Sequence, residues 1–206
     1  MDTFKKKLKE KIKKYSNDQY LDGYIKKEFF TSDGDADIYI NIEDKYELFD
    51  SWTIGGQIDL EKDVYEFIEE KTSMLGNHIP INLHIVGYEF TSHEQGVIRH
   101  ILKEHYAIEL YKAQKEYTNY KNKILCLILI GFASFGLYSF LFFVERFNYL
   151  VEVFGFLFSF ALWEAMDCAI YSFSEAKEKR EAITQNLLMN VSFDNEKDIK
   201  KQKITD

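Results

Sequence analysis

The chain has 206 residues, a net charge of −8 and a single proline. The acidic balance gives no general attraction to nucleic acid, so nucleic acid is not an expected partner. Both cysteines lie inside apolar segments, so the sequence carries no disulfide framework.

The N-terminal segment, residues 1–30, is basic and amphipathic. Phe4, Leu8, Ile12 and Tyr15 follow one another at helical spacing among lysines. Two interpretations stay open: a helix resting on the anionic inner leaflet of a membrane, or an ordinary solvated helix. No apolar run follows the lysines, so we expect no signal peptide here.

Residues 31–92 predict a small cytosolic α+β domain. Residues 37–42 alternate between polar and apolar side chains, as a half-buried strand does. Residues 61–75 place Val64, Phe67 and Ile68 at helical spacing, and Gly76-Asn77 is a typical helix stop. Residues 80–88 then predict a second strand, with Ile81, Leu83 and Ile85 on one face and the proline at its start.

No metal or cofactor is expected. An acidic stretch places Asp33, Asp35 and Asp37 at the spacing of a calcium loop, but Ile38 stands where that loop needs glycine. We therefore favour a plain acidic turn over a calcium site. The five histidines show no metal-binding spacing, and no nucleotide-binding or catalytic motif is present, so we expect no enzyme.

A long helix is predicted to begin near Thr91, where Thr91 with Glu94 and Ser92 with Gln95 both fit the capping-box pattern. No proline interrupts the chain from there to Val144. We expect residues 93–123 to form a connecting helix that continues into a membrane. A break near residues 117–122 is the alternative.

Residues 124–173 predict a two-helix transmembrane hairpin. The run from Ile124 to Val144 has no charged residue and would extend roughly 31 Å as a helix, about the thickness of a bilayer's hydrocarbon core. A second apolar run, Val153 to Trp163, follows a short polar connector. The fold class is therefore α+β, a small cytosolic mixed domain plus a membrane-embedded antiparallel helical hairpin entered by a long continuous helix.

Basic residues near the apolar runs predict the orientation of the hairpin. The connector holds only Arg146, whereas seven basic residues flank the other ends of the two runs. These are Lys112, Lys115, Lys121, Lys123, Lys177, Lys179 and Arg180. Because basic residues accumulate on the cytoplasmic side, we expect two spans in the cell (inner) membrane with both termini cytoplasmic.

The C-terminal part, residues 174–193, predicts a polar helix and then a strand that returns to the cytosolic domain. Residues 187–193 have the strand character. Residues 194–206 are charged and poor in apolar side chains, and we expect a disordered tail.

Polar and small residues near the end of the second apolar run are the candidate site. Glu164, Asp167 and Cys168 are predicted as pore-lining or intramembrane polar residues, because a carboxylate in a bilayer needs water, a cation or a partner. Ala161, Ala165 and Ala169 repeat every fourth residue, the spacing of closely packed membrane helices. Three placements of Glu164 stay open: the headgroup edge, a buried pairing, and a cation-selective pore.

The sequence resembles an uncharacterised group of prokaryotic proteins with two membrane spans. The resemblance rests on five stretches, which are Gly56–Leu60, Val64–Glu70, Ile81–Ile85, Glu94–Tyr106 and the pair Trp163-Glu164. The plan of a small cytosolic sensor fused to a helical hairpin is also similar to membrane effectors of bacterial antiphage systems, which assemble into pores.

These features and this likeness together suggest an oligomeric membrane effector or ion channel gated by its cytosolic domain, and the likeness implies a role in bacterial antiphage defence. The alternative is a membrane-anchored binding or scaffold module without pore activity. The expected partners are the lipid bilayer, further copies of the chain, and a cytosolic ligand or protein.

Overall fold

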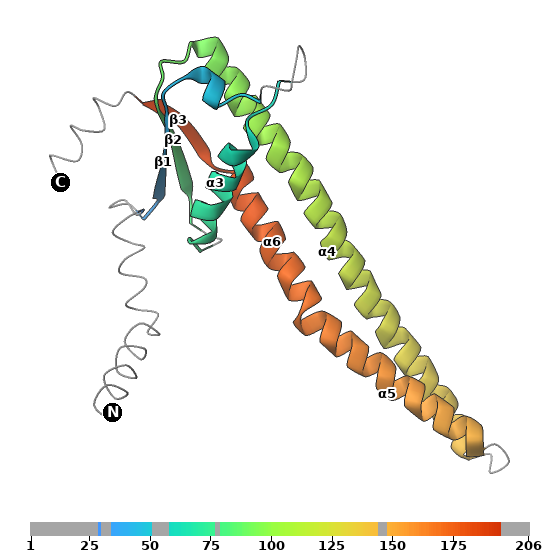
Figure 1. Ribbon diagram of the computed structural model, residues 1–206. Helices are drawn as coiled ribbons and strands as arrows, with labels where there is room; N and C mark the ends of the chain where they lie inside the picture. The colour runs from blue at the N-terminus through green and yellow to red at the C-terminus, as the bar shows by residue number, and fades with distance from the viewer. Residues whose placement is uncertain (1–28, 30–33, 51–57, 77–78, 144–147, 195–206) are drawn as a thin grey trace, which may run out of the picture. The chain divides into compact units, whose positions relative to one another are not determined.

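The computed structural model describes residues 29, 34–50, 58–76, 79–143 and 148–194 (Figure 1). It is a mixed α+β structure, mostly helical, with a small parallel sheet and two long apolar helices. The chain divides into two compact units. Unit 1 comprises Met1–Tyr106 and Thr184–Asp206, and unit 2 comprises Ala107–Ile183. The predicted amphipathic segment, apart from Phe29, and the predicted tail after Asp194 lie outside the described residues.

Unit 1 contains a three-stranded sheet in the order β1-β2-β3. The strands are β1 (Ala36–Ile42), β2 (Ile81–Gly87) and β3 (Asn190–Asp194), and both pairings are parallel. Parallel neighbours need a crossover connection. Helix α3 (Lys62–Ser73) connects β1 to β2, and all the later helices intervene between β2 and β3. The predicted return of the C-terminal strand to the sheet is confirmed.

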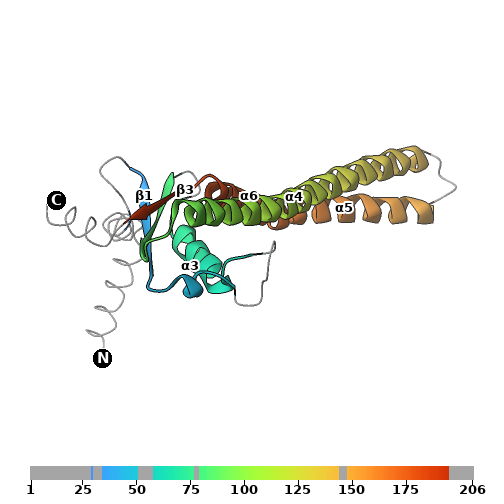
Figure 2. The same ribbon diagram turned by 90° about the horizontal axis from the view of Figure 1, so that it is seen from above.

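One face of the sheet forms the core of unit 1. Alternate side chains of β1 and β2, among them Ile38 and Leu83, are fully buried on this face. Helix α3 contributes Ile68, and the first turns of the next helix contribute Ile98 and Leu102, all of them fully buried or nearly so. The described helices of unit 1 therefore cover the apolar face of the sheet (Figure 2).

Gly87 closes β2 in a conformation that requires glycine. Its φ is +103°, and a Cβ built there would lie 2.5 Å from the carbonyl oxygen of Ile42. This close approach lets the next amide, that of Tyr88, donate a 2.8 Å hydrogen bond to the same oxygen. Glycine here holds the end of β2 against the end of β1.

Helix α4 (Ser92–Phe142) is continuous over 51 residues, so the alternative of a break near residues 117–122 is wrong. At its start, the Glu94 carboxylate accepts hydrogen bonds from the Thr91 amide and hydroxyl at 2.9 and 2.8 Å. The predicted Thr91–Glu94 capping box is thereby confirmed. The Gln95 side chain, predicted to cap with Ser92, instead donates to the carbonyl oxygen of Phe90 at 3.1 Å.

Unit 2 is an antiparallel pairing of α4 with α5 (Asn148–Ile170) and α6 (Ser172–Leu187). Contacts between the two sides run in opposite chain directions. From one end to the other they join Glu116 to Lys179, Tyr117 to Phe173, Lys123 to Glu164, Gly131 to Ala161 and Phe135 to Phe158. The predicted antiparallel helical hairpin is thus present as a helix pair, with α4 and α5 side by side in both views (Figures 1 and 2).

Two helical stretches are long and apolar enough to cross a membrane. In the most apolar 18-residue stretch of α4, only 11% is buried within the chain. In the most apolar stretch of Tyr149–Leu187, the buried share is 17%. The core helix of a soluble protein would be mostly covered by its own chain. These helices instead leave large side chains exposed, such as Phe132, Phe140 and Phe156 at 66, 67 and 70%.

Candidate functional site

The residues predicted as an intramembrane site lie on α5, and the small ones face α4. Ala161, Ala165 and Cys168 are buried, and Ala169 is half-buried. A Cβ built at Gly131 would lie 3.7 Å from that of Ala161, which shows how closely the two helices approach here. The small-residue face is therefore used for packing within the chain.

Glu164 forms an ion pair with Lys123 across the hairpin, with 2.9 Å between Oε1 and Nζ. Lys123 is the last charged residue before the uncharged run of α4. The pair therefore lies at the level where the uncharged run begins. Asp167, one turn further along α5, is exposed. These two carboxylates do not converge with a third metal-binding group within the described part of the chain.

A second cluster, which the sequence analysis missed, occupies the face of the sheet opposite the core. Because side chains alternate along a strand, the residues between the buried ones share this face. Three rows cross the sheet in register. We call these residues the polar sheet face: Asp37, Asn82 and Asn190 in the first row; Tyr39, His84 and Ser192 in the second; and Asn41 and Asp194 in the third, on either side of Val86, which is apolar and buried.

His84 is the centre of the polar sheet face. Its Nδ1 lies 2.5 Å from Oδ2 of Asp194 and 2.9 Å from Oγ of Ser192. Its ring stacks on the Tyr39 ring, with the two ring centroids 4.7 Å apart. Its Nε2 faces Oδ1 of Asp37 at 3.5 Å. The imidazole is therefore held by all three strands, and its side chain is only 20% exposed.

Further hydrogen bonds fix the first row. Asn82 donates to Oδ1 of Asp37 at 3.1 Å, and Asn190 donates to Oδ1 of Asn82 at 3.5 Å. Burial, and secondarily the Asp37 carboxylate, raises the pKa of the Tyr39 phenol above its ordinary value. Tyr39 therefore stays neutral and able to donate, as it does to Oδ2 of Asp37 at 3.4 Å.

The cluster contains serine, histidine and aspartate, but its geometry is not that of a nucleophilic triad. A triad needs the serine on one imidazole nitrogen and the carboxylate on the other. Ser192 and Asp194 share Nδ1, and the Ser192 hydroxyl itself donates to Asp194 at 3.0 Å. The carboxylate on the other side, that of Asp37, lies 3.5 Å from Nε2 and does not form a hydrogen bond with it. The arrangement orders a surface instead of activating a hydroxyl.

The signal for this cluster was present in the sequence. The predicted strand at residues 80–88 placed Ile81, Leu83 and Ile85 on one face, which puts Asn82 and His84 on the other. The contribution of Ser192 and Asp194 depends on β3 lying parallel beside β2. That neighbour relation joins residues more than 100 positions apart, and sequence spacing does not carry it.

Comparisons with protein-family models, with curated proteins and with solved structures find no match. The resemblance to prokaryotic two-span proteins therefore stays a prediction.

Proposed function

We propose that this protein is a membrane-anchored binding module. The hairpin of α4 and α5 holds the chain in a bilayer, and unit 1 binds a protein partner through the polar sheet face. Both termini are cytoplasmic in this proposal, following the excess of basic residues on that side of the spans.

The anchoring role is supported by contacts within the hairpin, which pair its carboxylate and cover its small residues. Glu164 is paired with Lys123, and Ala161, Ala165 and Cys168 are covered by the chain itself. Large apolar side chains, such as Phe132, Phe140 and Phe156, predominate on the surface left outside, which suits lipid. A pore would have to use the few polar groups that remain exposed on the hairpin, such as Ser159 and Asp167, against other copies.

The binding role rests on the polar sheet face. Purely parallel sheets are almost always covered on both faces. Here the described helices cover only the apolar face, and the other presents His84 and Tyr39 between the carboxylates of Asp37 and Asp194. Carboxylates beside an aromatic stack suit an arginine or lysine side chain, through ion pairing and cation–π contact. We therefore propose a partner with a basic segment.

Membrane flotation tests the anchor. The full chain, mixed with liposomes by detergent removal, should float with them and resist extraction at high pH. Planar-bilayer recording of the same preparation should show no conductance. Recovery of the chain in the soluble fraction of detergent-free lysates would contradict the anchoring proposal.

Site-specific photo-crosslinking tests the binding surface. A photoreactive residue in place of Tyr39 should crosslink a partner in cells, and Asp37→Asn with Asp194→Asn should abolish the product. A photoreactive residue in place of the exposed Tyr111 on α4 is the matched control. The product should persist when an unrelated two-span anchor replaces residues 124–170. Crosslinking that is unaffected by the two aspartate substitutions would refute the proposed surface.

The oligomeric channel is a second candidate, favoured by the continuity of α4. An unbroken helix from Ser92 to Phe142 passes a displacement of one end to the other more directly than a jointed connection. In this alternative, further copies of the chain complete a pore near Glu164. Conductance that falls on Glu164→Gln would support the channel and refute the simple anchor, whether or not the trigger relates to antiphage defence.

A further inference from the structure

The two outer strands of the sheet differ in how their backbone groups are used. In the order β1-β2-β3, β1 and β3 each pair with one neighbouring strand within the described residues. The amide and carbonyl of one residue point to the same side of a strand, and those of the next residue point to the other side. Each outer strand therefore directs half of its backbone groups away from β2, where a further strand can pair with them.

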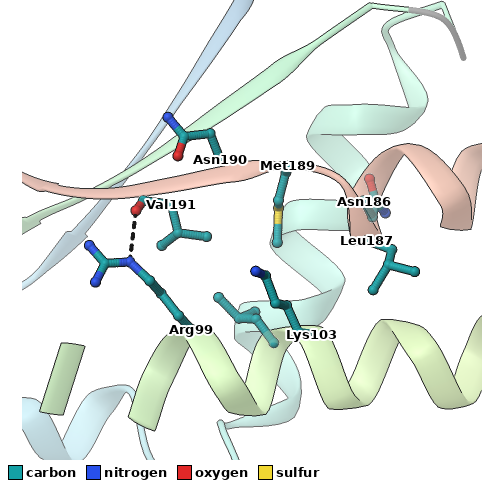
Figure 3. Close-up of a pocket in the computed structure, with 8 residues that line it drawn as sticks. Arg99, Lys103, Asn186, Leu187, Met189, Asn190 and Val191 are labelled. Carbon is teal, nitrogen blue, oxygen red and sulfur yellow. Dashed lines mark hydrogen bonds between the residues drawn. The ribbon is translucent and has the colours of Figure 1, made fainter. Parts of the chain in front are cut away.

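The outer edge of β3 is covered by Arg99 of α4. Figure 3 shows the Arg99 side chain reaching the carbonyl oxygen of Val191, to which its Nε donates at 3.1 Å. The guanidinium also lies 4.9 Å from the centre of the Phe193 ring. The pocket beside it has a volume of about 90 Å³, which is room for about three water molecules and not for a peptide. A side chain bound to this carbonyl opposes the addition of a strand at β3.

The outer edge of β1 carries backbone groups without a partner. At the two ends of the strand, the Ala36 amide donates to the carbonyl oxygen of Pro80, and the Ile42 carbonyl accepts from the amide of Tyr88. The even-numbered residues of β1 therefore face β2. The residues that alternate with them face outward, and these are Asp37, Tyr39 and Asn41. Their backbone groups form no hydrogen bond within the described ranges.

A groove lies beside this free edge, between β1 and α3. Its volume is about 330 Å³, within the range of ligand-binding pockets. Three successive residues of β1 line one side, and Val64 and Phe67 of α3 line the other. Ile40 and Val64 are buried and supply apolar surface, and Asp63 adds an exposed carboxylate. The edge of β1 thus combines a row of backbone groups with an apolar slot for side chains.

We propose that an extended peptide adds to β1 as a further strand, and that its side chains alternate between basic and apolar. Successive side chains of a strand point to opposite faces. Those on the polar sheet face meet the Asp37 carboxylate and the Tyr39 ring, which suit lysine or arginine. Those on the other face enter the groove over Ile40 and Phe67, which suit valine or leucine. The proposal rests on the proposed binding role of the polar sheet face, and it adds the conformation and side-chain pattern of the partner.

The charges at this edge favour a basic peptide over a second copy of the chain. Asp37 and Asp63 both lie at the free edge, and neither forms an ion pair with a lysine or arginine in the part of the chain that the structure describes. A second copy brings the same carboxylates, and like charges across two strands are destabilising. In strand addition, the backbone hydrogen bonds supply affinity and the side-chain pockets supply selectivity.

Fluorescence anisotropy with labelled synthetic peptides tests the proposal on the full chain in detergent. The probe alternates lysine and valine over nine residues. A second peptide has the same composition, with the lysines and the valines in two separate blocks. The alternating probe should bind about tenfold more tightly, because only this peptide, as a strand, directs all its lysines to one face and all its valines to the other.

Asn41→Pro tests the backbone edge. Proline removes the outward amide of this residue and leaves the hydrogen bonds between β1 and β2 in place, as edge strands tolerate. The variant should unfold within a few degrees of the parent chain and bind the alternating probe about tenfold less tightly, whereas Asn41→Ala should lose much less. Phe67→Ala should weaken binding about fivefold by removing apolar contact. Tyr46→Ala, an exposed aromatic residue outside the groove, is the matched control and should bind like the parent.

The outcomes separate strand addition from the role of the polar sheet face. Equal binding of the two peptides, or parent-like binding by Asn41→Pro, would overturn strand addition. If that binding still falls with Asp37→Asn and Asp194→Asn, the polar sheet face binds basic segments in another way and the proposed function stands. If neither peptide binds, both proposals are contradicted. With a photoreactive residue in place of Phe67, a crosslink to residues 1–28 of the same chain would assign the groove to that segment and overturn the external peptide.

Discussion

Two tyrosines in the core of unit 1 provide a matched test of the packing that supports the polar sheet face. Tyr106 is 1% exposed, and its hydroxyl has no hydrogen-bond partner in the described part of the chain. Tyr65 lies beside it in an edge-on ring contact, but its hydroxyl donates to Oδ1 of Asp59 at 2.6 Å. The same substitution, tyrosine to phenylalanine, should therefore have opposite effects at the two positions.

For Tyr106→Phe, the change removes a buried polar atom whose burial costs about 1–3 kcal/mol when it has no partner. We expect a gain of about 1 kcal/mol in the free energy of unfolding, because the ring itself is retained. For Tyr65→Phe, a hydrogen bond to a carboxylate is lost, and we expect a loss of about 1.5–3 kcal/mol. In a chain of this size, about 1 kcal/mol corresponds to a shift of about 2–4 °C in the unfolding midpoint.

Thermal unfolding of the full chain in detergent, followed by near-ultraviolet circular dichroism, measures both variants against the parent. The expected pattern is a raised midpoint for Tyr106→Phe and a lowered one for Tyr65→Phe. A fall for Tyr106→Phe as large as that for Tyr65→Phe would show that the Tyr106 hydroxyl has a partner. The description of this part of the core would then be wrong.

Three further predictions concern unit 1. Thr91→Ala removes the capping hydroxyl of α4 and should cost about 1 kcal/mol in chemical unfolding, whereas Thr91→Ser should cost much less. Gly87→Ala should destabilise by about 1–3 kcal/mol or more, since the new methyl group would meet the carbonyl oxygen of Ile42; unchanged stability would contradict the described end of β2. Burial raises the pKa of Tyr65 and of Tyr106, so the folded state keeps protons that the unfolded state releases near pH 10. Stability should therefore fall as pH rises above about 10, and less steeply in Tyr65→Phe; a flat profile between pH 9 and 11 would count against it.

The elements of this fold could be predicted where local patterns decide them. The uncharged run beginning at Ile124, the capping pair of Thr91 and Glu94, and the alternation in residues 37–42 each depend on neighbours in sequence. The observed α4 and β1 begin within one residue of the predicted starts. Local interactions at these positions and the tertiary structure favour the same conformation.

The arrangement of the elements was less accessible. The parallel order β1-β2-β3 brings Asp37, His84 and Asp194 together from three distant stretches of chain. In the sequence, Asp37 belongs to an acidic turn that was weighed only as a calcium loop, and His84 and Asp194 each look like an ordinary surface residue of a strand. The partner of Glu164 was inaccessible for the same reason, because Lys123 meets it only through the antiparallel hairpin.

The internal closure of the hairpin bears directly on the choice between anchor and channel. Membrane helices gain no hydrophobic stabilisation from contacting one another, so they associate through close packing of small residues and through polar contacts. On α5 the small residues, such as Ala161, and the carboxylate of Glu164 are used against α4. An oligomeric pore built from the same groups would have to break these contacts in every copy. The proposal therefore locates specific binding in unit 1, where contacts from three strands hold His84 on the sheet face that the described helices leave open.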